Sequence, residues 1–546
     1  MKSAIKFKFD KKELGLVLSI SAITLLLTHL IIIIAIIKAP PGQSFQVLFL
    51  DDEYSYFAFI EQARQGSFLF KNLYTSMPNA QVLFFPIFLV LGFIERLTNL
   101  THPQTYALAR AILGFIMLTA SYGFISYFIT NVKTRLLTFA FLCFSSGIGW
   151  LNILSQPLFP DYVNMFSVLY RTTAIPEALT FTLLISHPHF IAAVISMMIA
   201  FLFLLRSFEA ENQKRALYLA FGGSFFSALA FINHPYDLAI LITVPLAYCF
   251  VRRNKKVTTL TLIHFIFPLL TGLVGIFILR QNSVFSYFAG ELQLSPPVWY
   301  WLILYGLILP LSVGGGIVIL KNRAKGTYKE YHRWLFLIVW VIVTCFLLYS
   351  PISFQRRFIE GAHIPLSLLA GIFIYTVSAK FQNRLYRYIL SGAILLILSW
   401  QNIAYITDLY NQLLVKNTAG VYQKYSVLSA LEWAKSNVPK NSIAFSTPQF
   451  AVIIPSYTGL PVVFGHYGNT PYYYALVNEA RQEFFSLASE DSRRCRYLHK
   501  YAIEYYFENT AISDKEELYI ADKLSCLHKI YSDESVSIYT VNLSSL

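Results

Sequence analysis

The sequence predicts a polytopic α-helical membrane protein with an extracytoplasmic α/β domain at its C-terminal end. Of the 546 residues, 56% are hydrophobic and only 13% are charged, which is too little charge for the surface of a soluble protein of this size. Several apolar runs reach about 18 residues, the length that crosses a hydrocarbon core of roughly 30 Å. These runs are continuous and do not alternate with polar residues, so they predict helices and not barrel strands. After Tyr405 the composition becomes polar and mixed.

The N-terminal segment is basic and then long and apolar, "MKSAIKFKFDKKELGLVLSISAITLLLTHLIIIIAIIKAP". The apolar part is too long for a signal peptide, and no small-residue cleavage site follows it. We therefore expect the first transmembrane helix here, with its basic end in the cytoplasm.

The apolar runs predict about eleven spans. They cover residues 14–38, 105–130, 135–155, 189–206, 215–233, 237–251, 257–279, 298–320, 333–350, 361–378 and 387–406. With this count the basic loops all fall on one side, which the positive-inside rule assigns to the cytoplasm. The net charge of +14 is explained by these loops, so no nucleic-acid partner is expected.

Two short helices are predicted in the outer first loop, 39–104. The run 79–97 is short and contains Pro86, and counting it as a span would place every later basic loop outside. We expect it to lie at the outer membrane interface. Before it, Tyr56, Phe59, Ile60 and Ala63 share one helical face, which predicts an amphipathic helix too short to span. The transmembrane domain thus covers 1–406.

Residues 407–546 predict the outer α/β domain. "VLSALEWAKSNVPKNSIAFSTP" indicates a helix followed by a strand, and "LPVVFG", "YAIEYYF" and "VSIYTV" indicate further strands. Cys495 and Cys526 lie in this domain, where they either form a disulfide or remain two free thiols.

The first candidate for chemistry is the acidic triplet Asp51, Asp52 and Glu53, at the start of the first surface helix. A carboxylate in a partly dry site can act as a general base toward a hydroxyl or can hold a divalent cation. The alternative is a solvated cap, which the helix dipole favours.

A second outer loop, 156–188, supplies Asp161 and Glu177 as possible further carboxylates, and His187 and His189 flank Pro188 at the start of a span. The histidines are candidates for substrate binding, or are hydrogen-bonded residues at the membrane boundary. His234 and Asp237 in "FINHPYD" are interpreted as an ordinary polar turn.

Arg356 and Arg357 are the main outer basic pair of the membrane part. Guanidinium groups pair bidentately with phosphate, so an anionic ligand is one explanation. An ion pair with Glu360, or contact with lipid phosphates, is the other. There is no phosphate loop, HExxH motif or GxGxxG turn, so no nucleotide cofactor is expected.

In layout and motifs the chain resembles the GT-C superfamily of integral-membrane glycosyltransferases, and in particular the bacterial aminoarabinose transferases and protein mannosyltransferases that use polyprenyl-phosphate sugars. The first-loop motif of these enzymes, an Asp-Glu pair and a tyrosine-containing helix ending in glycine, is matched by Asp52, Glu53, Tyr56 and Gly66. Their late arginine segment is matched by "RRFIEGAHIP". The chain departs from the pattern by the extra Asp51 and the doubled arginine, so the base is either Asp51 or Asp52.

The resemblance implies an inverting transfer of a sugar from a polyprenyl-phosphate donor to an extracytoplasmic acceptor, which is a cell-envelope glycan, lipid or protein. Asp52 would deprotonate or orient the acceptor hydroxyl, Glu53 would assist or hold Mg or Mn, and Arg356 and Arg357 would stabilise the departing lipid phosphate. The other predicted substrate-binding residues are Tyr56, Glu177, His187 and His189. The enzyme would lie in the plasma membrane. The rival hypotheses are a transporter or lipid flippase, which predicts inverted repeats and midplane polar residues, and a non-enzymatic anchoring protein.

Overall fold

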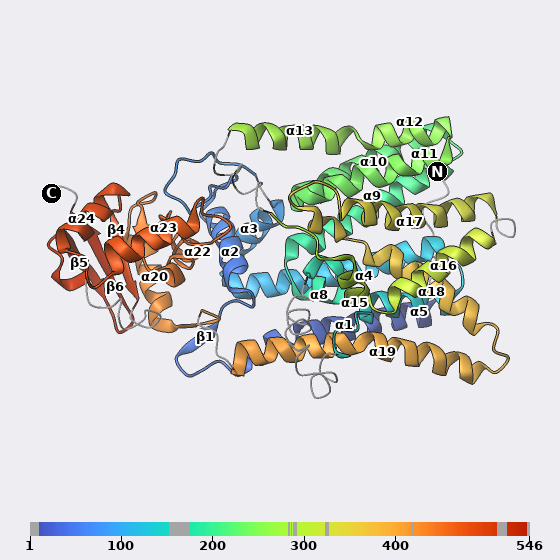
Figure 1. Ribbon diagram of the computed structural model, residues 1–546, viewed down its shortest axis with the longest axis horizontal. Coiled ribbons are helices and arrows are strands. Elements are labelled where there is room, and N and C mark those ends of the chain that lie inside the picture. Colours follow the sequence, from blue (N-terminus) through green and yellow to red (C-terminus); the bar gives the residue numbers. More distant parts are fainter. Residues whose placement is uncertain are drawn as a thin grey trace. The chain divides into compact units, whose positions relative to one another are not determined.

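The computed structural model describes residues 10–83, 85–151, 175–281, 284, 287, 292–322, 327–415, 420–509 and 521–542. The chain forms two compact units (Figure 1). We call the first the helical unit; it comprises Met1–Ile31, Leu108–Gly275 and Leu292–Leu409. We call the second the mixed unit; it comprises Ile32–Ala107, Ile276–Glu291 and Tyr410–Leu546.

Long apolar helices make up the helical unit, and most of them run alongside one another (Figure 1). Wholly or in large part, this unit contains α1 (Lys11–Ile37), α4 (His102–Phe128), α5 (Val132–Phe144), α8 (Thr180–Ile185), α9 (Pro188–Glu209), α10 (Gln213–Asn233), α11 (Leu238–Arg252), α12 (Lys255–His264), α13 (Ile266–Gln281), α15 (Val298–Tyr305), α16 (Ile308–Lys321), α17 (Tyr328–Leu347), α18 (His363–Ser378) and α19 (Arg384–Tyr410). Polar residues between these helices lie on three 3₁₀ turns, which are Pro176–Ala178, Pro235–Asp237 and Gln355–Ile359.

Among the described residues, nine helices are long and apolar enough to span a membrane. A tenth candidate is the pair α15 and α16, which bends by 91° where Gly306 adopts a φ of +51°. The fold class predicted from the sequence is confirmed, but this count is lower than the eleven predicted. The predicted span 135–155 overlaps the 13-residue helix α5, and the last residues of this span lie outside the described ranges.

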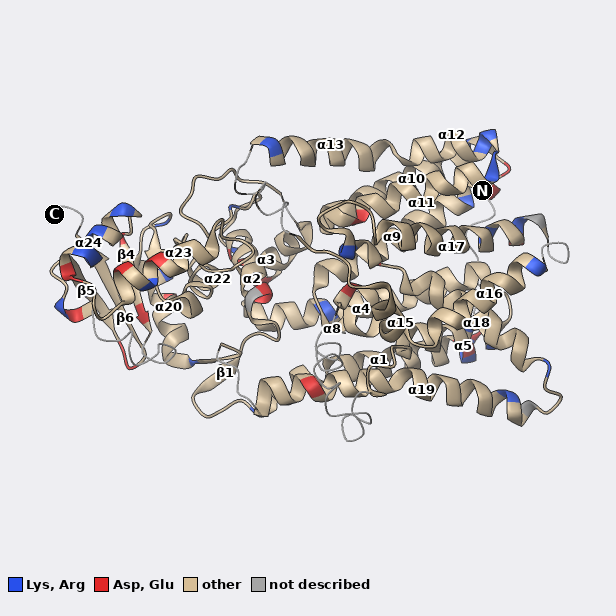
Figure 2. Cartoon of the chain, viewed as in Figure 1, with Lys and Arg blue, Asp and Glu red and all other residues tan. Residues whose placement is uncertain are grey.

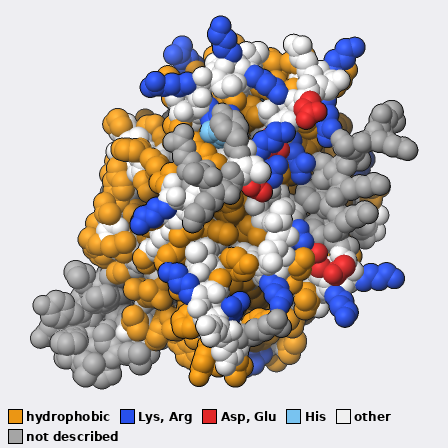
Figure 3. Space-filling model, turned by 90° about the vertical axis from the view of Figure 1, so that its right-hand side faces the viewer, with side chains coloured by type: hydrophobic (Ala, Val, Ile, Leu, Met, Phe, Trp, Pro, Cys, Tyr) orange, Lys and Arg blue, Asp and Glu red, His pale blue; other side chains and the backbone are white. Residues whose placement is uncertain are grey.

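Lysine and arginine gather mainly at one end of the helical unit, where α12, α17 and α19 begin and α16 ends (Figure 2). Figure 3 looks onto this end: basic side chains are spread over it, and hydrophobic side chains cover much of the flanks. The sequence-based expectation that the basic loops share one side is confirmed. This is the distribution that the positive-inside rule describes for a multi-pass membrane protein.

The mixed unit combines the first loop with the C-terminal segment. Its elements are β1 (Gln43–Phe45), α2 (Leu50–Arg64), α3 (Pro86–Thr98), β2 (Tyr422–Lys424), α20 (Tyr425–Asn437), β3 (Ala444–Phe445), α21 (Pro448–Ala451), α22 (Ile454–Thr458), α23 (Tyr473–Ala480), α24 (Asp491–Lys500), β4 (Tyr505–Asn509), β5 (Leu527–Ser532) and β6 (Val536–Val541). The predicted domain boundary assigned the first loop to the transmembrane part, whereas here that loop shares a unit with the C-terminal segment.

Backbone hydrogen bonds explain why the first loop belongs to this unit. β1 pairs with β2 in an antiparallel register that sets Gln43 opposite Lys424. The Val462 amide donates to the Leu73 carbonyl at 2.8 Å. Short extended segments leave backbone groups that need partners, and each segment supplies them to the other.

The C-terminal sheet has the order β3-β4-β6-β5, with β3 and β4 parallel and the other pairs antiparallel. The predicted helix α20 and the strands β3, β4 and β6 are confirmed. "LPVVFG" forms only a single bridge, from Val462 to Ala444, and the largely exposed edge strand β5 was not predicted. Cys495 and Cys526 form a disulfide with their Cα atoms 6.0 Å apart, which decides between the two alternatives.

Gly92 allows α2 and α3 to pack closely. A Cβ atom at this position would lie 2.3 Å from Ala63 Cβ and 2.6 Å from the Ile60 carbonyl oxygen. The two helices can pack this closely only because glycine has no Cβ atom. The position of α2, which carries the acidic triplet, therefore depends on this contact.

We expect Gly92→Ala to lower the stability of the protein by about 1–3 kcal/mol, since the added methyl group must push two backbones apart. Thermal unfolding of the purified protein in detergent measures this. Gly392→Ala is the matched control, because nothing lies within 4 Å of its Cβ position in helix α19. Equal stability of the two variants would show that the α2–α3 contact is not tight.

Candidate functional site

The acidic triplet opens helix α2, and its members differ in exposure. Glu53 is fully buried, and its Oε2 accepts a hydrogen bond from the Leu48 amide at 2.8 Å. The Asp52 side chain is 49% exposed. Asp51 lies in the first turn, and its side chain lies outside the described part of the structure. Glu53 therefore stabilises the start of the helix, while Asp52 presents its carboxylate to the surroundings.

The neighbouring Tyr54 is fully buried and donates to the Gly420 carbonyl at 2.9 Å. Burial raises the pKa of Tyr54, so its hydroxyl keeps its proton and this hydrogen bond. The contact fixes the first turn of α2 to the C-terminal segment of the same unit.

Asp52 faces a histidine from the segment "GHYGNTP". His466 Nε2 lies 3.5 Å from Asp52 Oδ1. His466 Nδ1 accepts hydrogen bonds from the Gly468 and Asn469 amides at 3.1 and 3.0 Å. A nitrogen that accepts two amide protons carries none itself, so the ring proton of a neutral imidazole lies on Nε2, the atom that faces Asp52.

The His466 loop is tied to the first loop. The Thr470 hydroxyl donates to the Tyr74 carbonyl at 2.7 Å, and the Asn72 side-chain amide donates to the Asn469 carbonyl at 2.7 Å. Spacing alone could not identify Asp52 as the partner of His466, because the two residues are far apart in the sequence.

The polar face of α2 is also buried. The carboxylate of Glu61 lies 2.8 Å from Arg64 Nε, 2.7 Å from Lys435 Nζ and 3.4 Å from His102 Nε2. His102 Nδ1 in turn lies 2.8 Å from Glu95. The predicted helix is confirmed, but its polar residues are covered by protein and balanced by these cations, which gives Asp52 a fixed support.

Tyr56, a predicted substrate-binding residue, lies on the aromatic side of α2. Its half-buried ring stacks on Phe88 at 5.0 Å and meets Phe85 edge-on at 6.3 Å. The packing against α3 accounts for an aromatic residue here.

In the helical unit, Arg357 forms an ion pair with the buried carboxylate of Glu177. Its Nε donates to Gln293 Oε1 at 2.5 Å, and its guanidinium lies 5.8 and 5.7 Å from the ring centres of Phe190 and Tyr236. The structure thus joins two predicted ligand-binding residues, Arg357 and Glu177. The alternative that paired the arginines with Glu360 is wrong for Arg357, whose carboxylate partner is Glu177.

The other predicted binding residues in this unit lie close by in the sequence. Arg356 is half-buried, and its amide donates to the Gln293 carbonyl at 3.1 Å. His187 and His189 are buried, with rings stacked 5.7 Å apart, and both contact Phe190, the ring that also lies beneath Arg357. Asp161, the other carboxylate considered in the second loop, lies outside the described residues.

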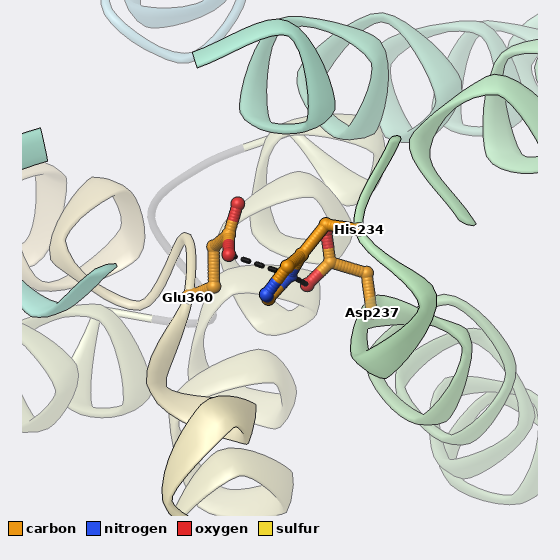
Figure 4. A group of neighbouring side chains, drawn as sticks. All are labelled: His234, Asp237 and Glu360. Atoms are coloured by element: carbon orange, nitrogen blue, oxygen red, sulfur yellow. Dashed lines mark hydrogen bonds and ion pairs between the residues drawn. The ribbon is translucent and has the colours of Figure 1, made fainter. Parts of the chain in front are cut away.

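Glu360 instead joins the turn that was interpreted as ordinary. His234 Nδ1 lies 2.7 Å from Glu360 Oε2 and 3.0 Å from Asp237 Oδ1 (Figure 4). Within the described ranges, these three residues form the one group of histidines, cysteines and carboxylates whose geometry can hold a metal ion. The His-Pro-Tyr-Asp turn could be recognised in the sequence. Glu360, the third member of the group, could not be assigned to it, because it is distant in the chain.

Comparisons with known proteins identify solved structures with a similar fold. No family model matches the chain, and neither does any curated protein sequence. The oligosaccharyltransferase of Archaeoglobus fulgidus, solved with a tethered acceptor peptide containing the NVT sequon, is similar over 96% of this chain and 74% of its own, with 12% identity and a TM-score of 0.57. The structure of AglB from the same organism, solved with an inhibitory peptide and a dolichol-phosphate, is similar over 97% of this chain and 74% of its own, with 12% identity and a TM-score of 0.53.

ArnT of Cupriavidus metallidurans, bound to undecaprenyl phosphate, is similar over 96% of this chain and 99% of its own at 13% identity, with a TM-score of 0.47. The Archaeoglobus enzyme is a member of the GT-C superfamily. The chain therefore has the fold that its resemblance to that superfamily predicted.

Proposed function

We propose that this protein is a membrane glycosyltransferase that moves a sugar from a polyprenyl-phosphate donor to an acceptor outside the cytoplasm. The observation that carries the proposal is the half-exposed Asp52 carboxylate, facing His466, in a chain that shares its fold with an oligosaccharyltransferase. The dolichol-phosphate named with that enzyme supports the lipid class of the donor. The acceptor is an envelope glycan, a lipid or a protein.

Asp52 is the proposed general base. Its exposure lets an acceptor hydroxyl approach, and a carboxylate within hydrogen-bond reach can take the hydroxyl proton as the bond to the sugar forms. Attack from the face opposite the lipid phosphate inverts the configuration at the sugar carbon. Asp51 remains the alternative base.

His466 is the proposed positioning residue for Asp52. Its Nε2–H faces Oδ1 at 3.5 Å, a contact that orients the half-exposed carboxylate. The two backbone amides on Nδ1 hold the ring in the donor form, so the orientation does not depend on substrate.

Arg356 and Arg357 are the proposed ligands of the lipid phosphate. Negative charge builds up on the leaving phosphate, and guanidinium groups stabilise it best when they are held in place beforehand. Arg357 is held by Glu177, Gln293 and two aromatic rings. Among the other candidates, Tyr56, His187 and His189 would shape the donor site.

The proposed location is the plasma membrane, with the basic end of the helical unit in the cytoplasm and the C-terminal segment outside. The Cys495–Cys526 disulfide supports this orientation, because disulfides persist in oxidising compartments. A divalent cation, Mg or Mn, with Asp52 among its ligands is also part of the proposal.

Asp52→Asn should lower turnover by about 10²–10⁴-fold, the usual contribution of a general base. The assay supplies radiolabelled polyprenyl-phosphate sugars with envelope acceptors and follows release of the lipid phosphate. Asp491→Asn is the matched control, since Asp491 is another exposed aspartate in the first turn of a helix. Turnover by Asp52→Asn at the wild-type rate would transfer the role to Asp51. A wild-type protein that neither consumes nor binds any donor would favour the transporter.

His466→Phe should lower kcat about tenfold, a barrier change of about 1.4 kcal/mol, and leave the KM for the donor unchanged, because the polar contact of Nε2 with Asp52 Oδ1 at 3.5 Å is lost. His466→Gln keeps an N–H donor and should recover part of the rate. Steady-state kinetics of the three proteins test this. If phenylalanine and glutamine reduce kcat equally, the ring has a packing role only.

Arg357→Ala should weaken donor binding by at least about tenfold, the share of one charge-assisted hydrogen bond. Glu177→Gln is the informative control: it removes the partner of Arg357 but keeps the guanidinium, so donor binding should be retained or become tighter. Scintillation proximity binding with the labelled donor measures both. Equal loss in both variants would mean that the ion pair only stabilises the fold.

A further inference from the structure

Three donor atoms converge at the turn Pro235–Asp237. His234 Nδ1 lies 3.0 Å from Asp237 Oδ1 and 2.7 Å from Glu360 Oε2, and the donor atoms of the three residues lie within 4.8 Å of one another. All three residues are at most 1% exposed. Figure 4 shows the carboxylates of Asp237 and Glu360 pointing toward the same imidazole from two different loops.

A single proton on the His234 imidazole does not balance the charges of this cluster. Two carboxylates carry two negative charges, while one imidazolium carries one positive charge. The positive charge of Arg357 acts on Glu360 from a distance, but the ion pair of Arg357 is with Glu177. Burying an uncompensated charge costs several kcal/mol, whereas a divalent cation with a neutral imidazole makes the group neutral.

Two further oxygen atoms lack partners. Asp237 Oδ2 and Glu360 Oε1 are buried and accept no hydrogen bond from any described residue. Buried polar atoms are nearly always satisfied. Both belong to carboxylates aimed into the cluster, where bidentate coordination would use them.

A second histidine between carboxylates shows what a purely structural arrangement looks like. At His102, Glu61 and Glu95 approach opposite ring nitrogens, so no single ion can join the three residues through one atom each. Arg64 and Lys435 complete that network and supply the missing positive charge. At His234 both carboxylates approach the same nitrogen.

We propose that His234, Asp237 and Glu360 bind a divalent transition-metal ion through Nδ1 and the two carboxylates. One imidazole with two carboxylates suits zinc or manganese better than magnesium, which rarely accepts nitrogen. Metal–ligand bonds of about 2.0–2.2 Å place ligands about 3.3 Å apart, so the distances from His234 Nδ1 to Glu360 Oε2 and Asp237 Oδ1 need to lengthen by only about 0.6 and 0.3 Å.

The ion would join the turn Pro235–Asp237 to the segment that follows the 3₁₀ turn Gln355–Ile359. Arg357 belongs to that 3₁₀ turn, and its guanidinium also lies against Tyr236 in the first turn. The metal would therefore hold Arg357 in place. This consequence rests on the proposed function of Arg357, whereas the metal site itself does not.

The test is metal content and binding, measured without donor or acceptor, so it stands apart from the transferase assay. Protein purified without chelator should contain about one zinc or manganese ion per chain by mass spectrometry. After chelator treatment, equilibrium dialysis of the Asp52→Asn variant, which lacks the separate cation site proposed at Asp52, should show one saturable site, with zinc bound more tightly than manganese and manganese more tightly than magnesium. Asp237→Asn and Glu360→Gln should each weaken binding at least tenfold, while His102→Gln should leave it unchanged.

X-ray absorption of the zinc-loaded wild type keeps the test valid if the variants do not fold. It should show nitrogen or oxygen neighbours at about 2.0–2.2 Å, including one imidazole and no sulfur. Less than a tenth of an ion per chain with no saturable site would overturn the proposal. So would a sulfur ligand, or undiminished binding in a folded Glu360→Gln variant.

Discussion

Buried carboxylates are the constraint on which both units depend. An isolated charge away from water costs several kcal/mol, so each buried acid needs a partner, and these partners join segments that are far apart in the chain. Glu61 joins α2 to Lys435 of α20, and Glu177 joins the 3₁₀ turn Pro176–Ala178 to Arg357. The polar residues of this apolar protein thus determine which loops come together, and apolar packing fills the space between them.

The same constraint explains how much could be predicted from the sequence. Local signals were sufficient for most of the fold: continuous apolar runs predicted the spans, and Pro86 begins α3 as its first residue. The break at Gly306 was missed because the glycine lies inside an apolar run that looks continuous. The 13-residue helix α5 was overestimated for a similar reason, since hydrophobicity continues past its end at Phe144.

The candidate site was less predictable, because it consists of pairs. Asp52, Arg357 and Glu177 were found individually from their residue type and position. Asp52 contacts His466, and Arg357 contacts Glu177 from 180 residues away in the sequence. A single sequence contains no signal that shows which of its distant residues are in contact. Glu360 is an example: an ion pair with the nearby arginines was one of the alternatives considered, whereas its ion-pair partner in the structure is His234.

The adjacent acids of the triplet also show why sequence adjacency does not imply a shared role. Successive residues of a helix point about 100° apart, so Asp52 and Glu53 cannot both face the same space. Glu53 turns inward and accepts a hydrogen bond from the Leu48 amide, where a carboxylate near the helix N-terminus is stabilised by the helix dipole and inaccessible to a substrate. Asp52 turns outward to His466, where a carboxylate can be approached and oriented at once. A general base needs both accessibility and a fixed orientation, and between Asp52 and Glu53 only Asp52 combines them.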